Sequence, residues 1–342
     1  MRYIYIFIIC FFPLSIIAQH GGVNAFSFVN TIHSPRIDAL GGSGIAIYDN
    51  DISLSTTTPS LLNSSMNNQI LFTYGDYFSD INLLSCAYVL KFKELGVFGF
   101  AVQAVNYGNF ERNDISGYNQ GNFSAHDQVI TFGIGKKIHS NFSIGVNIKL
   151  LNSHYDVYNA FALSSNISTT YINQGKRFSS TLLIKNIGRG IKHYSSIQEN
   201  LPWEAQIAIS KELEHLPFRY HLSYNNIMNF NIKSPYKLLM QTNIETGELE
   251  LKQESFAKTA LRHIIIGGEL NPFRKSFFIR GGINFQRRFD LTTINKPAMI
   301  GFSWGIGFRV FKYYFDYSRS AFHFSGIINN FSISTNLISF GI

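Results

Sequence analysis

The feature that most constrains this chain is an alternation of apolar and polar residues that recurs from about residue 69 through to residue 342. The stretch NFSIGVNIKL, residues 141–150, is typical: Phe142, Ile144, Val146 and Ile148 alternate with small or polar residues. A period of two places alternate side chains on opposite faces of a β-strand. Such two-faced strands suit a barrel with lipid outside and a polar interior, and they also suit a soluble sandwich.

The same alternation predicts about fourteen strands and no long amphipathic helix. The predicted strands are 69–77, 81–90, 95–106, 127–138, 141–154, 161–171, 178–187, 202–213, 218–227, 260–270, 276–289, 299–311, 313–320 and 330–342. An even number of antiparallel strands is typical of bacterial outer-membrane barrels. After Ala18 the sequence has no uncharged apolar run long enough for a transmembrane helix.

The connections between these strands favour the barrel. Those after even-numbered strands are short, and those after odd-numbered strands are mostly longer, with the first and fifth as exceptions. The long connections are residues 107–126, 188–201, 228–259 and 290–298. Outer-membrane barrels have short periplasmic turns and longer external loops. We therefore predict an all-β transmembrane antiparallel barrel over residues 67–342, with loops at the cell surface and with Phe142, Ile144, Val146 and Ile148 against lipid.

Composition and charge agree with this class. Only 15% of the residues are charged, where about a quarter is usual in soluble proteins, and the mean hydropathy is +0.03. The net charge of +8 raises the question of a nucleic-acid partner. The Lys and Arg residues are scattered along strands and turns, so we expect no nucleic-acid partner. A soluble exported β protein is the remaining structural alternative.

The N-terminal residues 1–18 are predicted to be an export signal. Arg2 supplies a basic start, residues 4–17 form an apolar run, and Ala18 is a small residue at a plausible cleavage site. An anchoring helix is the alternative, although spanning a membrane takes about 20 apolar residues.

Residues 19–66 differ from the rest because they are rich in Gly, Ser and Thr and contain no long alternating segment. Leu40, Ile45, Ile47, Leu54 and Leu61 make this segment too apolar for a free tail. We predict a plug inside the barrel lumen, and the alternative is a flexible periplasmic tail.

No catalytic, cofactor or metal signature stands out. Ser43 in GGSG lacks the strand–turn–helix context of a nucleophile elbow. Asp49 and Asp51 match the start of a calcium loop, but its position-6 Gly and closing Glu are absent. We expect no cofactor and no enzymatic activity. ETGELELKQE, residues 245–254, alternates Glu with Leu and predicts a small external hairpin.

The plug segment carries a family resemblance. GGVNAFSFVNTIHSPRIDALGGSGIAIYDNDISLSTTTPSLL, residues 21–62, resembles the start of mature PorV- and PorQ-type outer-membrane proteins of the type IX secretion system, and the PorQ type more. The A-L-G-G run and the acidic pair fit the pattern. Thr58 and Ser60 depart from the usual Asn-Pro-Ala-x-Leu. The plug residues singled out are Arg36, Asp38, Leu40, Gly41, Gly42, Asp49, Asp51 and Pro59.

The resemblance implies a barrel similar to the long-chain fatty-acid transporter (FadL-like) family, with fourteen strands and an N-terminal hatch. It also implies a non-enzymatic scaffold that holds a PorZ-like surface protein. PorU-like and PorV-like components would belong to the same attachment complex, which processes sorting-domain cargo and attaches it to the cell surface. External loops would bind the partner, and the four long connections are candidates.

The alternative function is transport of a hydrophobic small molecule such as a fatty acid. A lateral opening in the wall would need a kinked strand. The paired glycines Gly267–Gly268 and Gly281–Gly282 are candidates for that kink.

Overall fold

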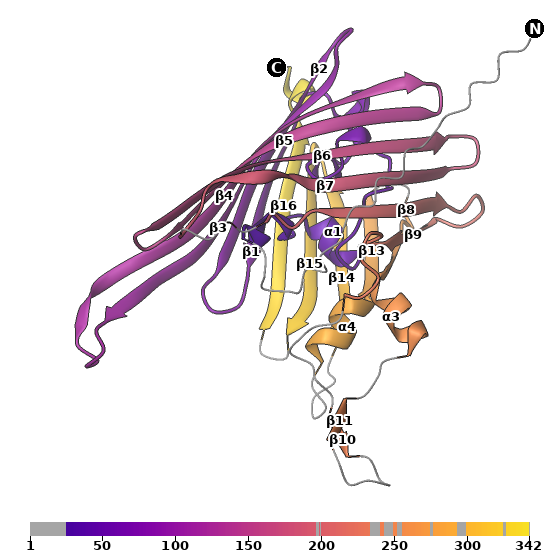
Figure 1. Ribbon diagram of the computed structural model, residues 1–342. Helices are drawn as coiled ribbons and strands as arrows, with labels where there is room; N and C mark the ends of the chain where they lie inside the picture. Colours follow the sequence, from indigo (N-terminus) through magenta and orange to yellow (C-terminus); the bar gives the residue numbers. More distant parts are fainter. Residues whose placement is uncertain are drawn as a thin grey trace, which may run out of the picture.

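The computed structural model describes residues 25–195, 198, 200–232, 240–242, 249–251, 255–273, 276–292, 299–323 and 326–341. The predicted export signal lies outside these residues. Fourteen antiparallel strands form one closed barrel, in which the first strand pairs with the last (Figure 1). This confirms the predicted fold class.

The barrel strands follow chain order around the wall. They are β1 Gln69–Asp76, β2 Asn82–Phe92, β3 Gly96–Asn113, β4 Asn119–His139, β5 Phe142–Tyr155, β6 Tyr158–Asn173, β7 Phe178–Lys192, β8 Glu204–Glu212, β9 Phe218–Tyr224, β12 Ile264–Leu270, β13 Phe277–Asn284, β14 Phe302–Val310, β15 Tyr313–His323 and β16 Gly326–Asn336. Helical elements are α1 Pro35–Ala39, α2 Ile52–Ser55, α3 Phe256–Arg262 and α4 Phe285–Leu291, with 3-10 turns η1 Ser27–Asn30, η2 Pro59–Leu61, η3 Ser64–Met66 and η4 Leu337–Phe340. No helix in the described ranges is both long enough and apolar enough to cross a membrane.

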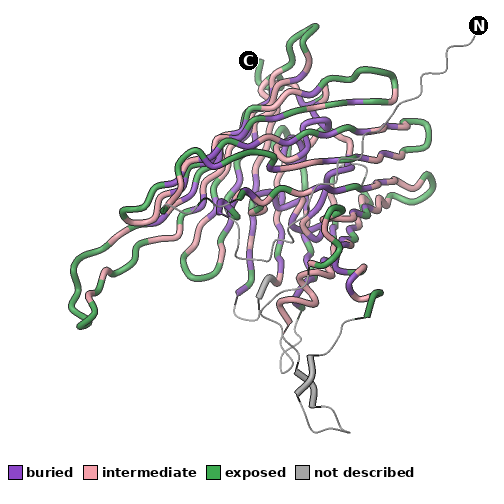
Figure 2. The backbone as a smooth tube through the Cα atoms, viewed as in Figure 1, coloured by how far each residue is buried: buried purple, intermediate pink, exposed green. Residues whose placement is uncertain are grey.

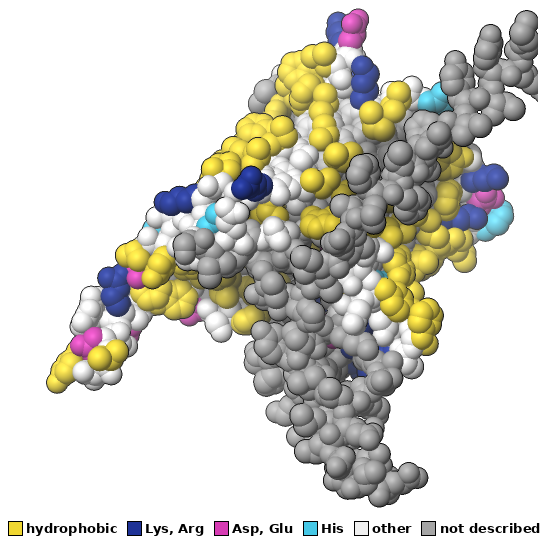
Figure 3. Space-filling model, in the orientation of Figure 1, with side chains coloured by type: hydrophobic (Ala, Val, Ile, Leu, Met, Phe, Trp, Pro, Cys, Tyr) yellow, Lys and Arg dark blue, Asp and Glu magenta, His cyan; other side chains and the backbone are white. Residues whose placement is uncertain are grey.

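The alternation in β5 separates an apolar outer face from a polar inner face. Ile144 and Ile148 are 46% and 51% exposed, whereas Asn147 between them is 1% exposed. The same holds around the wall, and hydrophobic side chains lie along the outside of the strands in Figure 3. A closed barrel with an apolar exterior buries its polar side chains in the lumen and offers the exterior to lipid.

The barrel has two distinct ends. At the turn end, short connections join β2 to β3, β4 to β5, β6 to β7, β8 to β9, β12 to β13 and β14 to β15. At the loop end, the connection from β9 to β12 carries a separate small sheet, β10 Met240–Thr242 paired with β11 Leu249–Leu251. The small hairpin was predicted at residues 245–254, and only its second strand, β11, lies in that range, because β10 begins at residue 240.

Four predicted boundaries were wrong. Residues 260–262 belong to α3, residues 285–289 to α4 and residues 337–340 to η4, not to strands. In α4 the Asn284 side chain caps the helix by accepting a hydrogen bond from the Arg287 amide at 3.0 Å, and this cap ends β13.

The fourth error concerns residues 107–126, which were expected to form a loop. Most of them extend β3 and β4 past a bulge after Asn106, leaving a turn at residues 114–118. The pairing of Phe110 with Phe123, whose rings stack 5.3 Å apart, supports the extension. The resulting hairpin projects from the barrel at the lower left of Figure 1.

The outer face of β5 gives the first prediction. Replacing Ile148, in the middle of the strand, with Arg should lower the free energy of folding into lipid vesicles by about 2–4 kcal/mol, because a charge at the bilayer midplane is poorly solvated. The matched change Phe142→Arg, at the first residue of the strand, should cost only about 0–1 kcal/mol. Guanidinium titrations of both variants would measure the difference, and equal costs would mean that this face does not contact the bilayer core.

Candidate functional site

Residues 25–66 lie inside the barrel and form what we call the plug. Leu40, Leu61 and Met66 are at most 1% exposed, and the interior segment is mostly buried in Figure 2. Helix α1 packs on β13, β14, β15 and β16, while η2 packs on β4, β5 and β6 across the lumen. The plug therefore contacts opposite sides of the wall.

Arg36 lies at the centre of the contact between plug and wall. Its guanidinium donates to Asp49 Oδ2 at 2.7 Å and to Asp51 Oδ2 at 3.1 Å, both within the plug. It also donates to both carboxylate oxygens of Glu269 in β12, each at 2.9 Å. The bidentate pairing with Glu269 joins two parts of the chain that are 233 positions apart.

Two wall arginines complete this arrangement. Arg219 in β9 donates to Asp49 at 2.8 Å and to Glu212 at 3.2 Å. Arg280 in β13 donates to Glu269 at 2.7 Å and also pairs with Asp316 in β15. We call this group the ion network, and its members are Arg36, Asp49, Asp51, Glu212, Arg219, Glu269, Arg280 and Asp316. It lies near the turn end of the barrel.

The ion network keeps the Asp49 carboxylate charged. Burial by itself would raise the pKa of the Asp49 carboxyl, but Arg36 and Arg219 outweigh it and hold this pKa well below its usual range. A lowered pKa in the folded state stabilises the fold above the unfolded-state pKa of about 4, and the contribution is lost as the pH falls below it. The docked plug is thus stabilised at neutral pH.

Asp38 makes a different contact with the wall. It accepts hydrogen bonds from Ser318 Oγ at 2.8 Å and from Asn330 Nδ2 at 3.1 Å. Burial raises the pKa of this carboxyl, although the nearby Arg287 and the hydrogen bonds act against the shift. Asp38 therefore holds α1 against β15 and β16 by hydrogen bonds.

Glycines in the wall allow the plug backbone to approach it closely. A Cβ on Gly282 would lie 2.2 Å from the Gly41 amide nitrogen, and one on Gly145 would lie 2.3 Å from the Pro59 carbonyl carbon. Gly41 and Gly42 themselves have φ of +88° and +98°, which favours glycine. The plug motif residues Leu40–Gly42 and Pro59 thus sit at two points of closest approach to the wall.

The glycine pairs of β12 and β13 were candidates for a lateral opening. In the structure these strands pair without a register shift from Ile265 to Leu270. Gly267, like Gly282, faces the plug: a Cβ there would lie 2.9 Å from the Leu40 carbonyl oxygen. Gly267 and Gly282 therefore accommodate the plug, and the pairing of β12 with β13 continues past all four glycines.

A row of asparagines holds the other side of the plug, and the sequence analysis missed it. Asn147, Asn166 and Asn186 stand on the neighbouring strands β5, β6 and β7, all at most 1% exposed. Their side-chain amides donate to Thr56 O at 3.1 Å, to Thr57 O at 2.7 Å and to the Asn30 side chain at 2.9 Å. The signal that could have found the row is a polar amide at inward positions of three consecutive strands.

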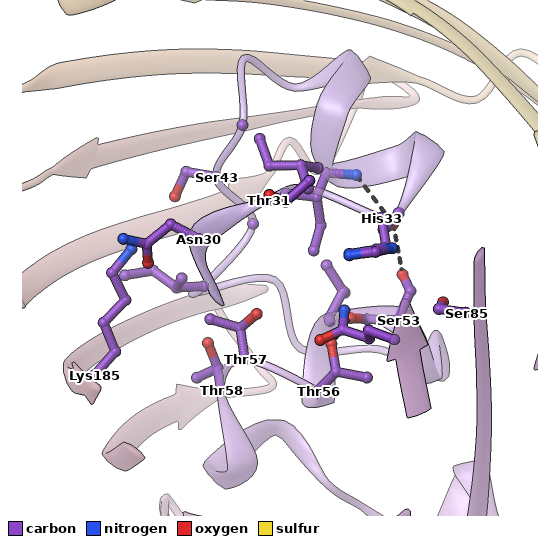
Figure 4. Close-up of a pocket in the computed structure, with 18 of the residues that line it drawn as sticks. Asn30, Thr31, His33, Ser43, Ser53, Thr56, Thr57, Thr58, Ser85 and Lys185 are labelled. Carbon is purple, nitrogen blue, oxygen red and sulfur yellow. Dashed lines mark hydrogen bonds between the residues drawn. The ribbon is translucent and has the colours of Figure 1, made fainter. Parts of the chain in front are cut away.

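A cavity, partly open to solvent, lies between the plug and the wall (Figure 4). Hydroxyl and amide side chains line it, together with Lys149 and Lys185. Figure 4 shows Thr56, Thr57, Thr58 and Ser53 grouped below the cavity. Aliphatic side chains also line it, so the lining is mixed; they are Val29, Ile32, Ile37, Ile45, Leu54 and Leu71.

The candidate partner-binding connections lie at the loop end. The extended β3–β4 hairpin ends in a turn where Ile115 and Tyr118 are 109% and 74% exposed. Residues 188–192 belong to β7, and parts of 188–201, 228–259 and 290–298 lie outside the described residues. Among the described parts, the β3–β4 hairpin carries the most exposed apolar side chain.

Comparisons with known proteins show the fold. No protein-family model matches the sequence, and a search of curated proteins found no match. Among solved structures, the chain is similar to the CymD monoaromatic hydrocarbon channel, with a TM-score of 0.51, 10% identity, and coverage of 88% of this chain and 97% of that one. A Pseudomonas aeruginosa FadL homologue gives a TM-score of 0.50 with 10% identity, covering 88% and 98%.

The toluene transporter TbuX from Ralstonia pickettii gives a TM-score of 0.49 with 12% identity, covering 88% of this chain and 97% of that one. On the two likenesses with TM-scores of 0.51 and 0.50, the chain has the fold of FadL-like outer-membrane channels. Together with the apolar exterior of the closed barrel, this fold supports the predicted location in the outer membrane.

Removing the central charge of the ion network should loosen the plug. Arg36→Met leaves Glu269 and Asp49 with fewer counter-charges, so we expect the free energy of unfolding to fall by about 3–5 kcal/mol. Arg177→Met is the matched control, because Arg177 makes a half-exposed ion pair with Glu212 that should be worth about 0–1 kcal/mol. Denaturant titrations would compare them, and equal losses would show that the ion network does not fix the plug.

The contact at Gly282 can be tested by adding a side chain. Gly282→Val should push Leu40 and Gly41 off the wall and increase hydrogen–deuterium exchange of the amides in residues 35–42 at least about tenfold, because their packing would be lost. Gly281→Val is the control on the outer face, where a Cβ would come no nearer than 3.9 Å to Ser303 O. Unchanged hydrogen–deuterium exchange in Gly282→Val would contradict the contact of Leu40 and Gly41 with the wall.

Proposed function

We propose that this chain is a non-enzymatic outer-membrane scaffold whose lumen stays closed and whose loop end holds a surface protein. The observation that carries the proposal is the attachment of the plug on opposite sides of the lumen, by the ion network and by the asparagine row. A protein that opens a route through its lumen has to move or reshape its plug. Here any such movement would separate buried charged groups from their partners, which costs free energy.

The described cavity combines polar and apolar groups. Hydroxyl, amide and ammonium groups line it together with aliphatic side chains, and two of the glycines proposed for a lateral opening, Gly267 and Gly282, contact the plug instead. A hydrophobic ligand gains little binding free energy from the polar groups, because it would remove their water without replacing the hydrogen bonds. This argues for a structural role of the lumen.

The secretion-system assignment rests on the plug motif. The residues that resemble the PorQ-type pattern are the ones that hold the plug: Asp49 and Asp51 bind Arg36, and Leu40–Gly42 lie against the wall. On this basis we propose that the surface partner is a PorZ-like protein, in an attachment complex with PorU-like and PorV-like components. The β3–β4 hairpin is the proposed contact, because its apolar tip stands clear of the barrel.

Transport of a hydrophobic small molecule is the second candidate, and the fold comparison favours it. The solved structures with TM-scores of 0.50 and 0.51 are described as a FadL homologue and a monoaromatic hydrocarbon channel, and neither is described as a secretion component. The comparisons therefore support this candidate better than the scaffold. The two lysines in the cavity and the fixed plug favour the scaffold.

Gene deletion would separate the two candidates. In the deletion strain we would follow sorting-domain cargo in the surface, medium and periplasmic fractions, and in parallel the uptake of labelled fatty acid and toluene. The scaffold predicts loss of surface attachment with unchanged uptake, reversed by the wild-type gene. Normal cargo attachment would refute it, and slower uptake in that strain would establish the transporter.

The hairpin tip can then be tested in the complemented strain. Ile115→Asp with Tyr118→Asp should abolish co-purification of the surface partner and reduce cargo attachment to the deletion level, because apolar anchors dominate binding at interfaces. Leu216→Asp is the matched control, since Leu216 is 60% exposed at the turn end. If both variants retain the partner, another part of the loop end binds it.

A further inference from the structure

Lys149 is a buried lysine of the lumen, and its described contacts include no carboxylate. Its side chain projects from β5 into the cavity, and the residue is 4% exposed. Its Nζ donates one hydrogen bond, to the neutral Asn186 Oδ1 at 3.2 Å. An ammonium has three donors, and a buried charge is costly unless it is paired.

The other lumen cations show the contrast. Arg36 pairs with three carboxylates, and Lys185 pairs with Glu204 at 3.0 Å. The side chains that line the cavity include no carboxylate among the described residues. Lys149 therefore has no carboxylate partner among the described residues that line the cavity.

Two other buried polar groups line the same cavity without a described hydrogen-bond partner. They are the Thr58 hydroxyl, on a residue that is 0% exposed, and His33 Nδ1, on a residue that is 6% exposed. Burial lowers the pKa of His33 to about 4, so its imidazole is neutral at pH 7 and its ring nitrogens are available for hydrogen bonding. Figure 4 shows Thr58 and His33 on the plug side of the cavity, with Lys185 reaching in from the wall.

Asn30, which also lines the cavity, is linked to the lysine through Asn186. Its side-chain oxygen accepts from Asn186 Nδ2 at 2.9 Å, and Asn186 in turn accepts from Lys149. Asn186 is thus oriented by two neighbours, with its oxygen directed at the ammonium. The Lys149 side chain is thus held in place, and its other N–H groups remain free to donate to a further partner.

We propose that the cavity between plug and wall is a binding site for a small oxyanion, a phosphate or a carboxylate, held by the Lys149 ammonium with hydroxyl and amide donors around it. An oxyanion would neutralise the buried charge and accept the hydrogen bonds that the protein leaves unmade. The cavity volume accommodates such an ion together with water. This site is independent of the scaffold function, because it concerns binding to the isolated barrel.

Equilibrium dialysis of the purified full-length chain in detergent would test the proposal. Labelled inorganic phosphate and labelled acetate would be used separately, at constant ionic strength set with chloride. We expect saturable binding of at least one of them, at about one ion per chain. Lys149→Met should weaken that binding by about tenfold or more, as expected for the loss of one charge-assisted hydrogen bond.

Lys93→Met is the matched control, because Lys93 is exposed in the turn between β2 and β3 and should leave binding unchanged. Heat-dependent gel mobility would check that each variant is folded. If Lys149→Met does not fold, Thr58→Val provides a second test. This variant removes the free hydroxyl at constant shape and should weaken binding several-fold. Absence of saturable binding of both ions, or equal binding by wild type and Lys149→Met, would overturn the proposal.

Discussion

The structure depends on the pairing of Arg36 with Glu269. Their side chains are only 7% and 4% exposed, so both charges need close partners. Arg36 completes its pairing with Asp49 and Asp51 of the plug, and Glu269 completes its pairing with Arg280 of the wall. The plug therefore has one position in which its charges are matched. The glycines that let Gly41 and Pro59 touch the wall make this position accessible, and Asp38 and the asparagine row hold the remaining sides.

The architecture of the barrel follows from the same requirement, that buried polar groups need partners. In β5 the polar side chains face a lumen filled by the plug, so Asn147 and Lys149 are buried in a protein interior instead of lining a water-filled pore. Backbone groups of the wall are satisfied by closure of the sheet, since β1 pairs with β16 along its whole length. The plug must then supply hydrogen-bond partners for the inner face, which explains its content of Gly, Ser and Thr.

Much of the wall could be predicted from the sequence, because alternation is a local signal. The strand order and the lipid-facing residues of β5 needed only neighbouring positions. The helices α3 and α4 were missed because each is only seven residues long, and in α4 the apolar Phe285, Phe289 and Leu291 also fit a period of two. The extension of β3 and β4 was missed because polar residues replace the apolar ones where the hairpin leaves the barrel. For the site, Arg36, Asp49 and Asp51 were singled out as plug residues. Their wall partners Glu269, Arg219 and Arg280 were not, because they are distant in sequence and look like ordinary inward-facing strand residues.

The likeness to hydrocarbon channels and the character of the lumen point to different functions, and the physical chemistry of the lumen is the more specific of the two. A barrel of fourteen strands with an N-terminal segment inside it describes the wall and the topology, which many functions can share. What passes or binds inside is decided by the groups that line the space. Here those groups are ammonium, hydroxyl and amide groups beside aliphatic side chains, and Lys149, whose described hydrogen bond goes to a neutral amide, lies among them. The proposed oxyanion site and the proposed partner contact at the loop end rest on these groups and on the fixed plug, whereas the proposed transport of a hydrophobic molecule rests on the fold comparison.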